Sequence, residues 1–229
     1  MSTRQRKRMG NEDRLFDFVV TCLAVGTLLI TLYPLYFVVI ASISDPDAIV
    51  TGKTLLIPKG ISFRGYNFIF QEKRIWLGYL NTIFYAVSGT FLGATATTLA
   101  GYALSRKDLI GRGLIMKILV FTMFFHGGLI PSYINVSNLH LVDTPWIIII
   151  LGSVTVFNII ITRSYFQTTL PDELLEAAYL DGCGNFRFFV SIALPLSKVI
   201  IAVISIYLIV YYWNSYFNAL VFLRSQDLM

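Results

Sequence analysis

The sequence has 229 residues, of which 56% are hydrophobic and only 14% are charged, with 18 Lys and Arg against 13 Asp and Glu. Soluble domains are typically about 45–50% apolar and about 25% charged. This composition excludes a disordered chain, a disulfide scaffold and an ordinary water-soluble enzyme, so we expect an all-α protein that crosses a membrane several times.

Charged residues are missing from five long stretches of the chain. These stretches cover residues 18–44, 75–105, 118–142, 144–162 and 199–223. A helix needs about 20 mostly apolar residues to cross the roughly 30 Å hydrocarbon core, so each stretch predicts one transmembrane span. We therefore expect a basic tail over residues 1–14 and a bundle of five membrane-spanning helices within residues 15–229.

The positive charges are distributed unevenly between the two sides of this bundle. If the five stretches span, twelve of the eighteen Lys and Arg residues lie on the side of the N-terminus. Cytoplasmic loops collect Lys and Arg, so the N-terminus is predicted to be cytoplasmic. The cluster Arg4, Arg6, Lys7 and Arg8 is interpreted as a topology anchor; binding of RNA or DNA is the alternative, and we expect no nucleic-acid partner.

The first span is expected at about residues 15–43, where its apolar region is too long for a cleaved signal peptide. Pro34 lies inside it, and neighbouring helices can accommodate the resulting kink. Residues 44–74 are rich in turn formers, and their aromatic residues predict a short helix at the membrane interface. The second span, at about residues 76–104, carries the pattern Gly89-x3-Gly93, which lets helices approach closely.

The later spans are delimited by helix-breaking residues. The run from His126 to Pro131 contains two glycines and should end the third span. Pro145 and Trp146 suit the start of the fourth span at a membrane interface, and the span is expected to end at Arg163. The fifth span is predicted at about residues 194–223.

The loop between the fourth and fifth predicted spans has the most informative pattern. Pro171 suits the first turn of a helix, with Thr169 as a nearby cap and acidic residues following at the positive end of the helix dipole. Gly182 permits the turn that ends this helix, and Asn185 is expected to cap a second one. The loop therefore predicts a compact helix–turn–helix on the membrane surface.

The string EAAYLDGCGNFRFFVSIALP, residues 176–195, resembles the EAA loop of ABC-importer permeases. That loop reads E-A-A, D-G-A and I-x-L-P, with nine residues between the glycine and the isoleucine, and Gly182 and Ile192 keep this spacing. Cys183 stands where alanine is usual. Further segments are similar to the maltose-transporter-like carbohydrate permeases, in particular the subgroup for complex oligosaccharides. These are GGLIPSY at 127–133, VFNIIITRSYFQ at 156–167 and YYWNSYFNALVFL at 211–223.

The resemblance implies the type I ABC-importer permease fold and an ATP-driven alternating-access importer of oligosaccharide in the bacterial inner membrane. It implies a second permease subunit in a heterodimer, two ATP-binding subunits, an extracytoplasmic sugar-binding protein and surrounding membrane lipid. ATP and Mg²⁺ are expected in the ATPase partners and no cofactor in this chain. Family members usually have a sixth span after a short external loop, so we expect one span to be missing from this sequence.

The same resemblance implies an ATPase-coupling role for the loop at about residues 163–195, which we name the coupling loop. Glu176 is the candidate for a charged contact with a basic ATPase residue, Asp181 and Gly182 hold the turn, and small residues permit close packing. The full set is Glu176, Ala177, Ala178, Asp181, Gly182, Ile192, Leu194 and Pro195. For Glu176 the alternative is a solvated helix charge without a partner.

Polar and aromatic residues within the spans are candidates for lining a sugar path, because amides and aromatic rings suit sugars and buried polar groups are costly in a bilayer. They are Asn81, Tyr85, Asn158, Trp213, Asn214 and Asn218. Hydrogen bonding between helices and interfacial placement of the aromatic residues is the alternative for each of them.

Other function classes are less well supported by the sequence. It has no Gly-rich phosphate loop and no Ser-His-Asp set, so we expect a non-catalytic subunit. His126 and His140 have no second ligand at metal-site spacing, and no metal is expected. The alternatives are an ABC permease for a polyamine, amino acid or phosphate, and a secondary transporter. The five stretches contain no carboxylate with which a secondary transporter could couple ions.

Overall fold

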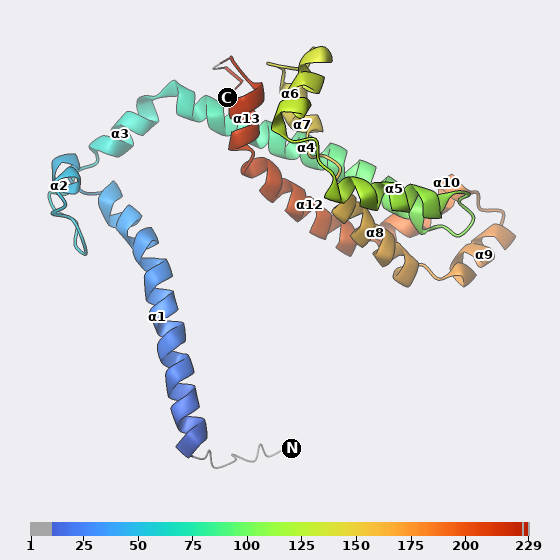
Figure 1. Ribbon diagram of the computed structural model, residues 1–229, viewed down its shortest axis with the longest axis horizontal. Coiled ribbons are helices and arrows are strands. Elements are labelled where there is room, and N and C mark those ends of the chain that lie inside the picture. The colour runs from blue at the N-terminus through green and yellow to red at the C-terminus, as the bar shows by residue number, and fades with distance from the viewer. Residues whose placement is uncertain (1–10, 226, 229) are drawn as a thin grey trace. The chain divides into compact units, whose positions relative to one another are not determined.

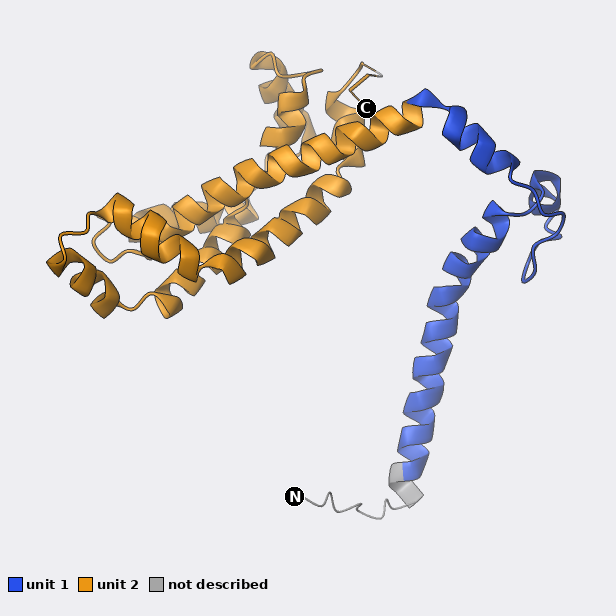
Figure 2. Ribbon diagram, turned by 180° about the vertical axis from the view of Figure 1, so that it is seen from behind, with its two compact units in different colours: residues 1–73 blue, residues 74–229 orange. Residues whose placement is uncertain are grey.

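The computed structural model describes residues 11–225, 227 and 228, and helices dominate this part of the chain (Figure 1). The cluster Arg4, Arg6, Lys7 and Arg8 of the predicted basic tail lies outside the described residues. The chain divides into two compact units, residues 1–73 and 74–229 (Figure 2). The first unit contains α1 Asn11–Ser42, α2 Pro46–Val50 and α3 Arg64–Gln71.

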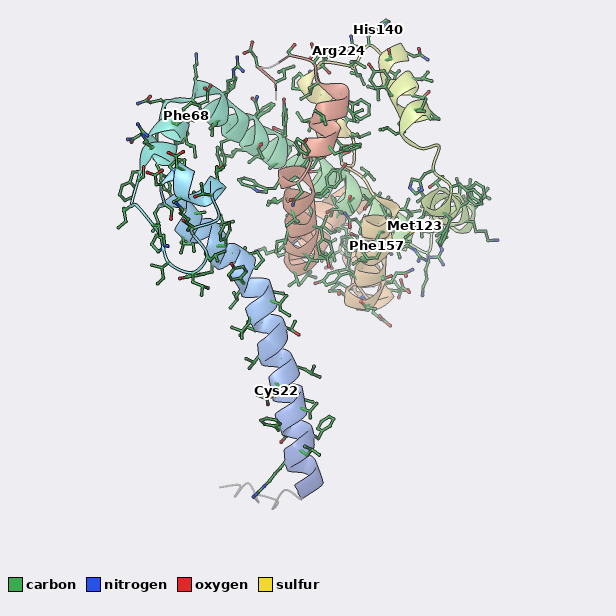
Figure 3. The ribbon with its side chains drawn as sticks, turned by 60° about the vertical axis from the view of Figure 1, so that its left-hand side comes forward. Cys22, Phe68, Met123, His140, Phe157 and Arg224 are labelled. Carbon is green, nitrogen blue, oxygen red and sulfur yellow. The ribbon has the colours of Figure 1, made fainter. Side chains whose placement is uncertain are left out.

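Helix α1 confirms a continuous helix in the first predicted span, with Pro34 inside it. Its segment Arg14–Ser42 is long and apolar enough to cross a membrane. Figure 3 shows its side chains projecting on all sides of the helix, Cys22 among them. Apolar side chains exposed around the whole circumference are what a helix surrounded by lipid or by other helices requires.

The segment that follows α1 is a compact turn region with two short helices. The Asp45 carboxylate accepts a hydrogen bond from the Asp47 amide at 2.9 Å and so caps α2. The Tyr66 hydroxyl donates to Ser42 Oγ at 2.9 Å and ties α3 to the end of α1. The short helix expected among the aromatic residues of 63–70 is present as α3.

The second unit begins with the long helix α4. Its other elements are α5 Arg112–Phe124, α6 Leu129–Asn138, α7 Pro145–Ile150, α8 Val156–Thr169, α9 Asp172–Leu180, α10 Asn185–Phe188, the π-helical turn Phe189–Ala193, α11 Leu194–Leu196, α12 Lys198–Trp213 and α13 Tyr216–Phe222. Helix α4, Lys73–Ser105, is the second element that is unbroken and apolar enough to span a membrane.

Glycines on one face of α4 let other elements approach its backbone. A Cβ added at Gly89 would lie 2.2 Å from the Tyr212 ring, and one at Gly93 would lie 2.4 Å from the Ser153 carbonyl oxygen. A Cβ added at Gly101 would lie 2.6 Å from the Thr162 side chain. The predicted small-residue face is therefore confirmed as a packing surface within the chain, used by α12, by the turn after α7 and by α8.

The third predicted span is broken where its glycines predict a break. Helices α5 and α6 are bent by 116° relative to each other across residues 125–128. Gly128 has a φ of 83°, a backbone conformation that L side chains rarely adopt.

The expectation of one continuous helix over residues 144–162 is wrong. Helix α7 ends at Ile150 and α8 begins only at Val156. Gly152 adopts a φ of 80°, and its missing Cβ would lie 2.3 Å from the Tyr211 hydroxyl oxygen. The buried Tyr212 hydroxyl donates to the Ile149 carbonyl at 2.6 Å. The carbonyls freed at the end of α7 are thus satisfied by α12, which makes the interruption tolerable in an apolar setting.

The fifth predicted span is also segmented. Helix α12 ends at Trp213 and α13 follows at Tyr216, while the helical segment Asn185–Leu196 meets α12 at an angle of 76°. Among the described residues two helices are long and apolar enough to cross a membrane by themselves, and counting each of the two bent pairs as one span gives up to four. The number of five spans therefore remains a prediction.

Three clusters of buried residues hold the second unit together. One joins Tyr85 of α4 to α7 and to Phe222 of α13. The middle cluster packs Ala86 and Ala94 of α4 against one face of α12. The third lies within the coupling loop and includes Phe166, Phe188 and other side chains from α8 to the π-helical turn.

Candidate functional site

The coupling loop folds as the predicted helix–turn–helix. Helix α8 ends at Thr169, which is therefore a helical residue and not the cap that we expected. Pro171 occupies the N-cap position of α9 with an extended backbone, and Asp172 and Glu173 form the acidic first turn. Negative charge at this end of a helix is stabilised by the helix dipole.

Gly182 ends α9 in the manner that its sequence position predicts. Its φ is 73°, the left-handed conformation for which glycine is preferred. The Cys183 amide donates to the Ala178 carbonyl at 2.9 Å, and the Gly182 amide donates to the Tyr179 carbonyl at 3.0 Å. This pair of bonds is a Schellman motif, which satisfies the last carbonyls of α9 and reverses the chain.

The second helix of the loop starts one residue earlier than we expected. Gly184, not Asn185, occupies the N-cap position of α10. The Asn185 side chain instead accepts a hydrogen bond from the Tyr179 hydroxyl of α9. Asn185 therefore fastens the two arms of the turn to each other instead of capping the helix that follows.

The predicted coupling residues divide into an exposed and a buried set. Glu176 and Ala177 are exposed on α9, whereas Ala178 is buried in the cluster that contains Phe166 and Phe188. Asp181, Gly182 and Pro195 are exposed, and Ile192 and Leu194 pack half-buried against the same cluster. Only the exposed set is available to another protein, because the buried set already packs within the loop.

The exposed face of α9 and of the turn carries apolar side chains as well as charge. Leu180 is 90% exposed and Phe186 is 79% exposed. Glu176, Ala177 and Leu180 are exposed at helical spacing on one side of α9, and we name this surface the α9 face. Large apolar side chains left in the open beside a carboxylate are typical of a protein–protein contact.

An ion pair connects the coupling loop to the turn between α4 and α5. The Lys107 ammonium donates to the Asp172 carboxylate, 65 residues further along the chain. This hydrogen bond, together with the nearby charges of Lys107, Arg106 and Arg112, holds the pKa of Asp172 below its usual range. Sequence reasoning missed this pair, since nothing local to either residue indicates its partner.

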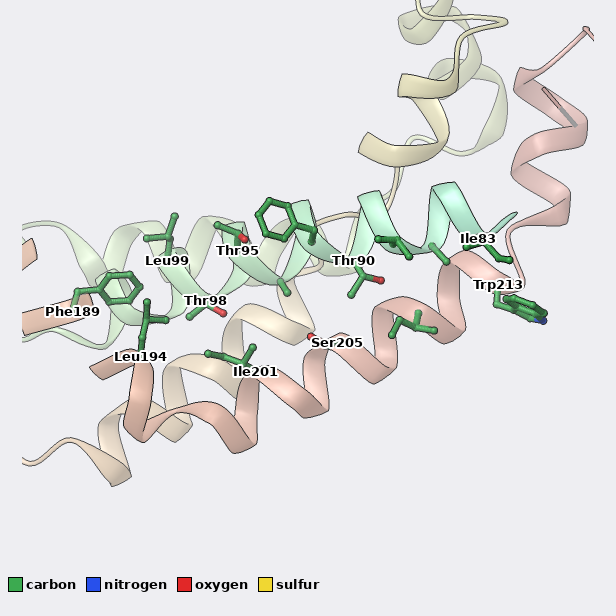
Figure 4. Close-up of a pocket in the computed structure, with 15 residues that line it drawn as sticks. Ile83, Thr90, Thr95, Thr98, Leu99, Phe189, Leu194, Ile201, Ser205 and Trp213 are labelled. Atoms are coloured by element: carbon green, nitrogen blue, oxygen red, sulfur yellow. The ribbon is translucent and has the colours of Figure 1, made fainter. Parts of the chain in front are cut away.

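A cavity of about 690 Å³ lies between α4 and α12 (Figure 4). Its lining is mostly apolar, with Phe91, Leu99 and Ile201 among the residues that form it. The Thr90 and Thr98 hydroxyls also line it, and they are buried without a hydrogen-bond partner among the described residues. A sugar would leave most of its hydroxyls unpaired against such a wall.

The structure does not gather the six predicted path residues at one site. Within the described part of the chain Trp213 alone of the six lines the large cavity. Asn81 donates to the Asp227 carbonyl at 2.9 Å, and Tyr85 donates to the Leu228 carbonyl at 2.8 Å.

The other three path residues are placed as follows. Asn158 is buried in the first turn of α8, Asn214 donates to the Val210 carbonyl of its own helix, and Asn218 donates to the Tyr211 hydroxyl. The hydrogen bonds described for Asn81, Tyr85, Asn214 and Asn218 are all made within the chain, so a role in lining a path remains a prediction.

Asp143 lies in the loop before α7 and joins it to the segment that follows α13. Its carboxylate accepts hydrogen bonds from the Ser225 hydroxyl at 2.6 Å and from the Arg224 and Ser225 amides at 2.8 Å each. These bonds, the Ser225 hydroxyl first, hold the pKa of Asp143 below its usual range. The Arg224 guanidinium, labelled in Figure 3, donates to the Tyr133 hydroxyl. The loop before α7 is thereby tied to the segment after α13.

Comparison with known proteins adds independent evidence. Residues 93–228 match the family described as binding-protein-dependent transport system inner membrane component. The polygalacturonan/rhamnogalacturonan transport system permease protein YtcP of Bacillus subtilis is 38% identical over 215 residues, which cover 94% of this chain and 75% of that protein. Protein LplC of the same organism is 33% identical over 213 residues, 93% of this chain and 72% of LplC.

A solved structure shares the fold. A chain from the crystal structure of a bacterial ABC transporter involved in the import of the acidic polysaccharide alginate aligns with a TM-score of 0.92 and 33% sequence identity. The alignment covers 97% of this chain and 79% of that chain.

Proposed function

The chain belongs to the family of binding-protein-dependent transport system inner membrane components, and from this premise we propose that it moves carbohydrate across the membrane. Members of this family are the membrane permease components of ABC importers. These components transport the solute and do not catalyse a reaction. The solute proposed here is an oligosaccharide derived from a larger polysaccharide. The names of YtcP and of the alginate importer support this solute class, and both proteins align over more than nine-tenths of this chain.

The exposed α9 face is the observation that carries the proposed mechanism. Helix α9 protrudes between α8 and α10, with Glu176 and Ala177 exposed and Leu180 left almost entirely uncovered. We assign this face to a groove on an ATPase subunit, where Glu176 meets a basic residue. ATP and Mg²⁺ are bound by that partner, so the permease is the element whose two conformations the ATPase biases.

The assembly proposed for this permease has five subunits. A second, different permease subunit completes the path, two ATPase subunits bind on the cytoplasmic side, and a sugar-binding protein delivers solute from outside. The N-terminus is placed in the cytoplasm together with the coupling loop. The excess of Lys and Arg on that side, twelve of eighteen, supports this orientation.

A charge reversal at the α9 face tests the docking. Glu176→Lys places like charge against the basic ATPase residue, so we expect less ATPase to co-purify with the permease and less stimulation of ATP hydrolysis by the binding protein. Asp17→Lys is the control, because it changes an exposed acid of α1 by the same charge. Unchanged assembly and unchanged stimulation with Glu176→Lys would contradict the proposed docking.

A further inference from the structure

The α9 helix is attached to the rest of the unit in two different ways. Its buried side, Leu175 and Ala178, packs against Phe166 and Phe188 inside the coupling loop. Its N-terminal end is attached by charge, through the ion pair between Asp172 and Lys107. The first attachment joins α9 mainly to its sequence neighbours, with Tyr102 of α4 packed against the same cluster. The second joins α9 to a turn 65 residues away.

The turn that carries Lys107 is itself firmly held. The Arg112 guanidinium at the start of α5 donates to the Arg106 carbonyl at 3.1 Å. The Arg163 side chain of α8 donates to the Leu104 carbonyl in the last turn of α4 at 3.0 Å. Arg106 also lies 3.7 Å from the Asp108 carboxylate. Lys107 therefore projects from a scaffold in which α4, α5 and α8 are joined.

The ion pair is too exposed to be important for folding. The side chains of Lys107 and Asp172 are 73% and 40% exposed, and ion pairs this exposed contribute little to the stability of a fold. The position of the ion pair in the fold indicates its role better than its contribution to stability does. Asp172 is the first residue of the helix that presents Glu176 outward, so the pair fixes the end of that helix against the inner ends of α4 and α5.

We propose that Lys107 and Asp172 are positioning residues, which pass a displacement of α9 to the inner ends of α4 and α5. The inference rests on the proposed docking of an ATPase against the α9 face. When the ATPase moves α9, the buried contacts carry α8 and α10 along. Through Tyr102, which packs against the same cluster, these contacts also reach α4. The ion pair adds a direct attachment from the start of α9 to the turn between α4 and α5.

A double-mutant cycle in the assembled transporter tests this role. We compare the wild type with Lys107→Glu, Asp172→Lys and the double variant, measuring ATPase retained on purification and solute taken up per ATP hydrolysed. We expect each single variant to retain the ATPase but to lower uptake per ATP by about two- to fivefold, the upper range for an exposed pair. The double variant should restore most of the loss.

Lys117→Glu is the matched control, since Lys117 is an exposed cation of α5 that makes no ion pair with the described residues. Suppose that the wild type takes up solute as it hydrolyses ATP. Single variants that then keep full uptake per ATP would overturn the role of the ion pair and leave the proposed function intact. So would variants that lose the ATPase itself, because the pair would then serve assembly. A wild-type permease that retains no ATPase would overturn the proposed function and with it this inference.

Discussion

Gly93 is the position at which the packing of α4 can be tested most sharply. A Cβ there would lie 2.4 Å from the Ser153 carbonyl oxygen and 2.9 Å from Leu208 Cδ1. The carbonyl belongs to the turn between α7 and α8, where the Ser153 amide donates to the Ile150 carbonyl at 3.1 Å, so backbone and not a flexible side chain must move. The change to test is therefore Gly93→Ala.

Overpacking of this kind costs about 1–3 kcal/mol, and a backbone contact belongs at the upper end. Alanine returns up to about 1 kcal/mol through its higher helix propensity. The net loss for Gly93→Ala is then about 2 kcal/mol, which corresponds to a melting midpoint lowered by about 4–8 °C for a chain of this size.

The assay is thermal unfolding of the purified chain in detergent, compared with Gly113→Ala. A Cβ at Gly113 in α5 meets no atom within 4 Å, so this control should leave the midpoint unchanged or raise it slightly. Equal midpoints for the two variants would refute the close approach of the α7–α8 turn to α4.

Three further predictions concern single interactions. Tyr212→Phe leaves the Ile149 carbonyl without its buried donor and should cost about 1–3 kcal/mol in chemical unfolding, which an unchanged midpoint would contradict. Because the folded pKa of Asp143 lies below its unfolded value, the contribution of Asp143 is present above about pH 4 and is lost as the pH falls through the folded pKa. Unfolding measured over an acid pH series should therefore show a loss of stability that Asp143→Asn lacks. The same pH dependence in both proteins would contradict a stabilising role for the hydrogen bonds of Asp143. Gly182→Ala forces a side chain into the left-handed conformation and should cost about 1–2 kcal/mol, whereas Gly182→Asn should cost less, and equal midpoints would contradict this account.

The sequence predicted those helices that are determined by the residues within them or directly beside them. Runs without charge located α1 and α4, since each is a single apolar helix with no interruption. The coupling loop was also predictable, because Pro171 and Gly182 mark the ends of α9 through their own backbone preferences. Even there Asn185 was placed wrongly, because the Tyr179 hydroxyl engages its side chain.

What the sequence did not predict depends on contacts between distant segments. The stretch 144–162 is apolar throughout, so hydropathy could not distinguish one helix from two. The break after Ile150 is tolerated because Tyr212, 63 residues away from Ile149, supplies the missing donor. The ion pair of Lys107 and Asp172 is of the same kind. The six predicted path residues share only a polar or aromatic character, which does not determine where the fold places them.

The central claim is that this chain is the permease through which an ATPase drives carbohydrate import. The most direct test is uptake of labelled oligogalacturonide into proteoliposomes that contain the co-purified complex, with the sugar-binding protein outside and ATP on the ATPase side. Uptake should require both ATP and the binding protein, and it should fall with Glu176→Lys but not with Asp17→Lys. Uptake that continues without ATP or without the binding protein would contradict it.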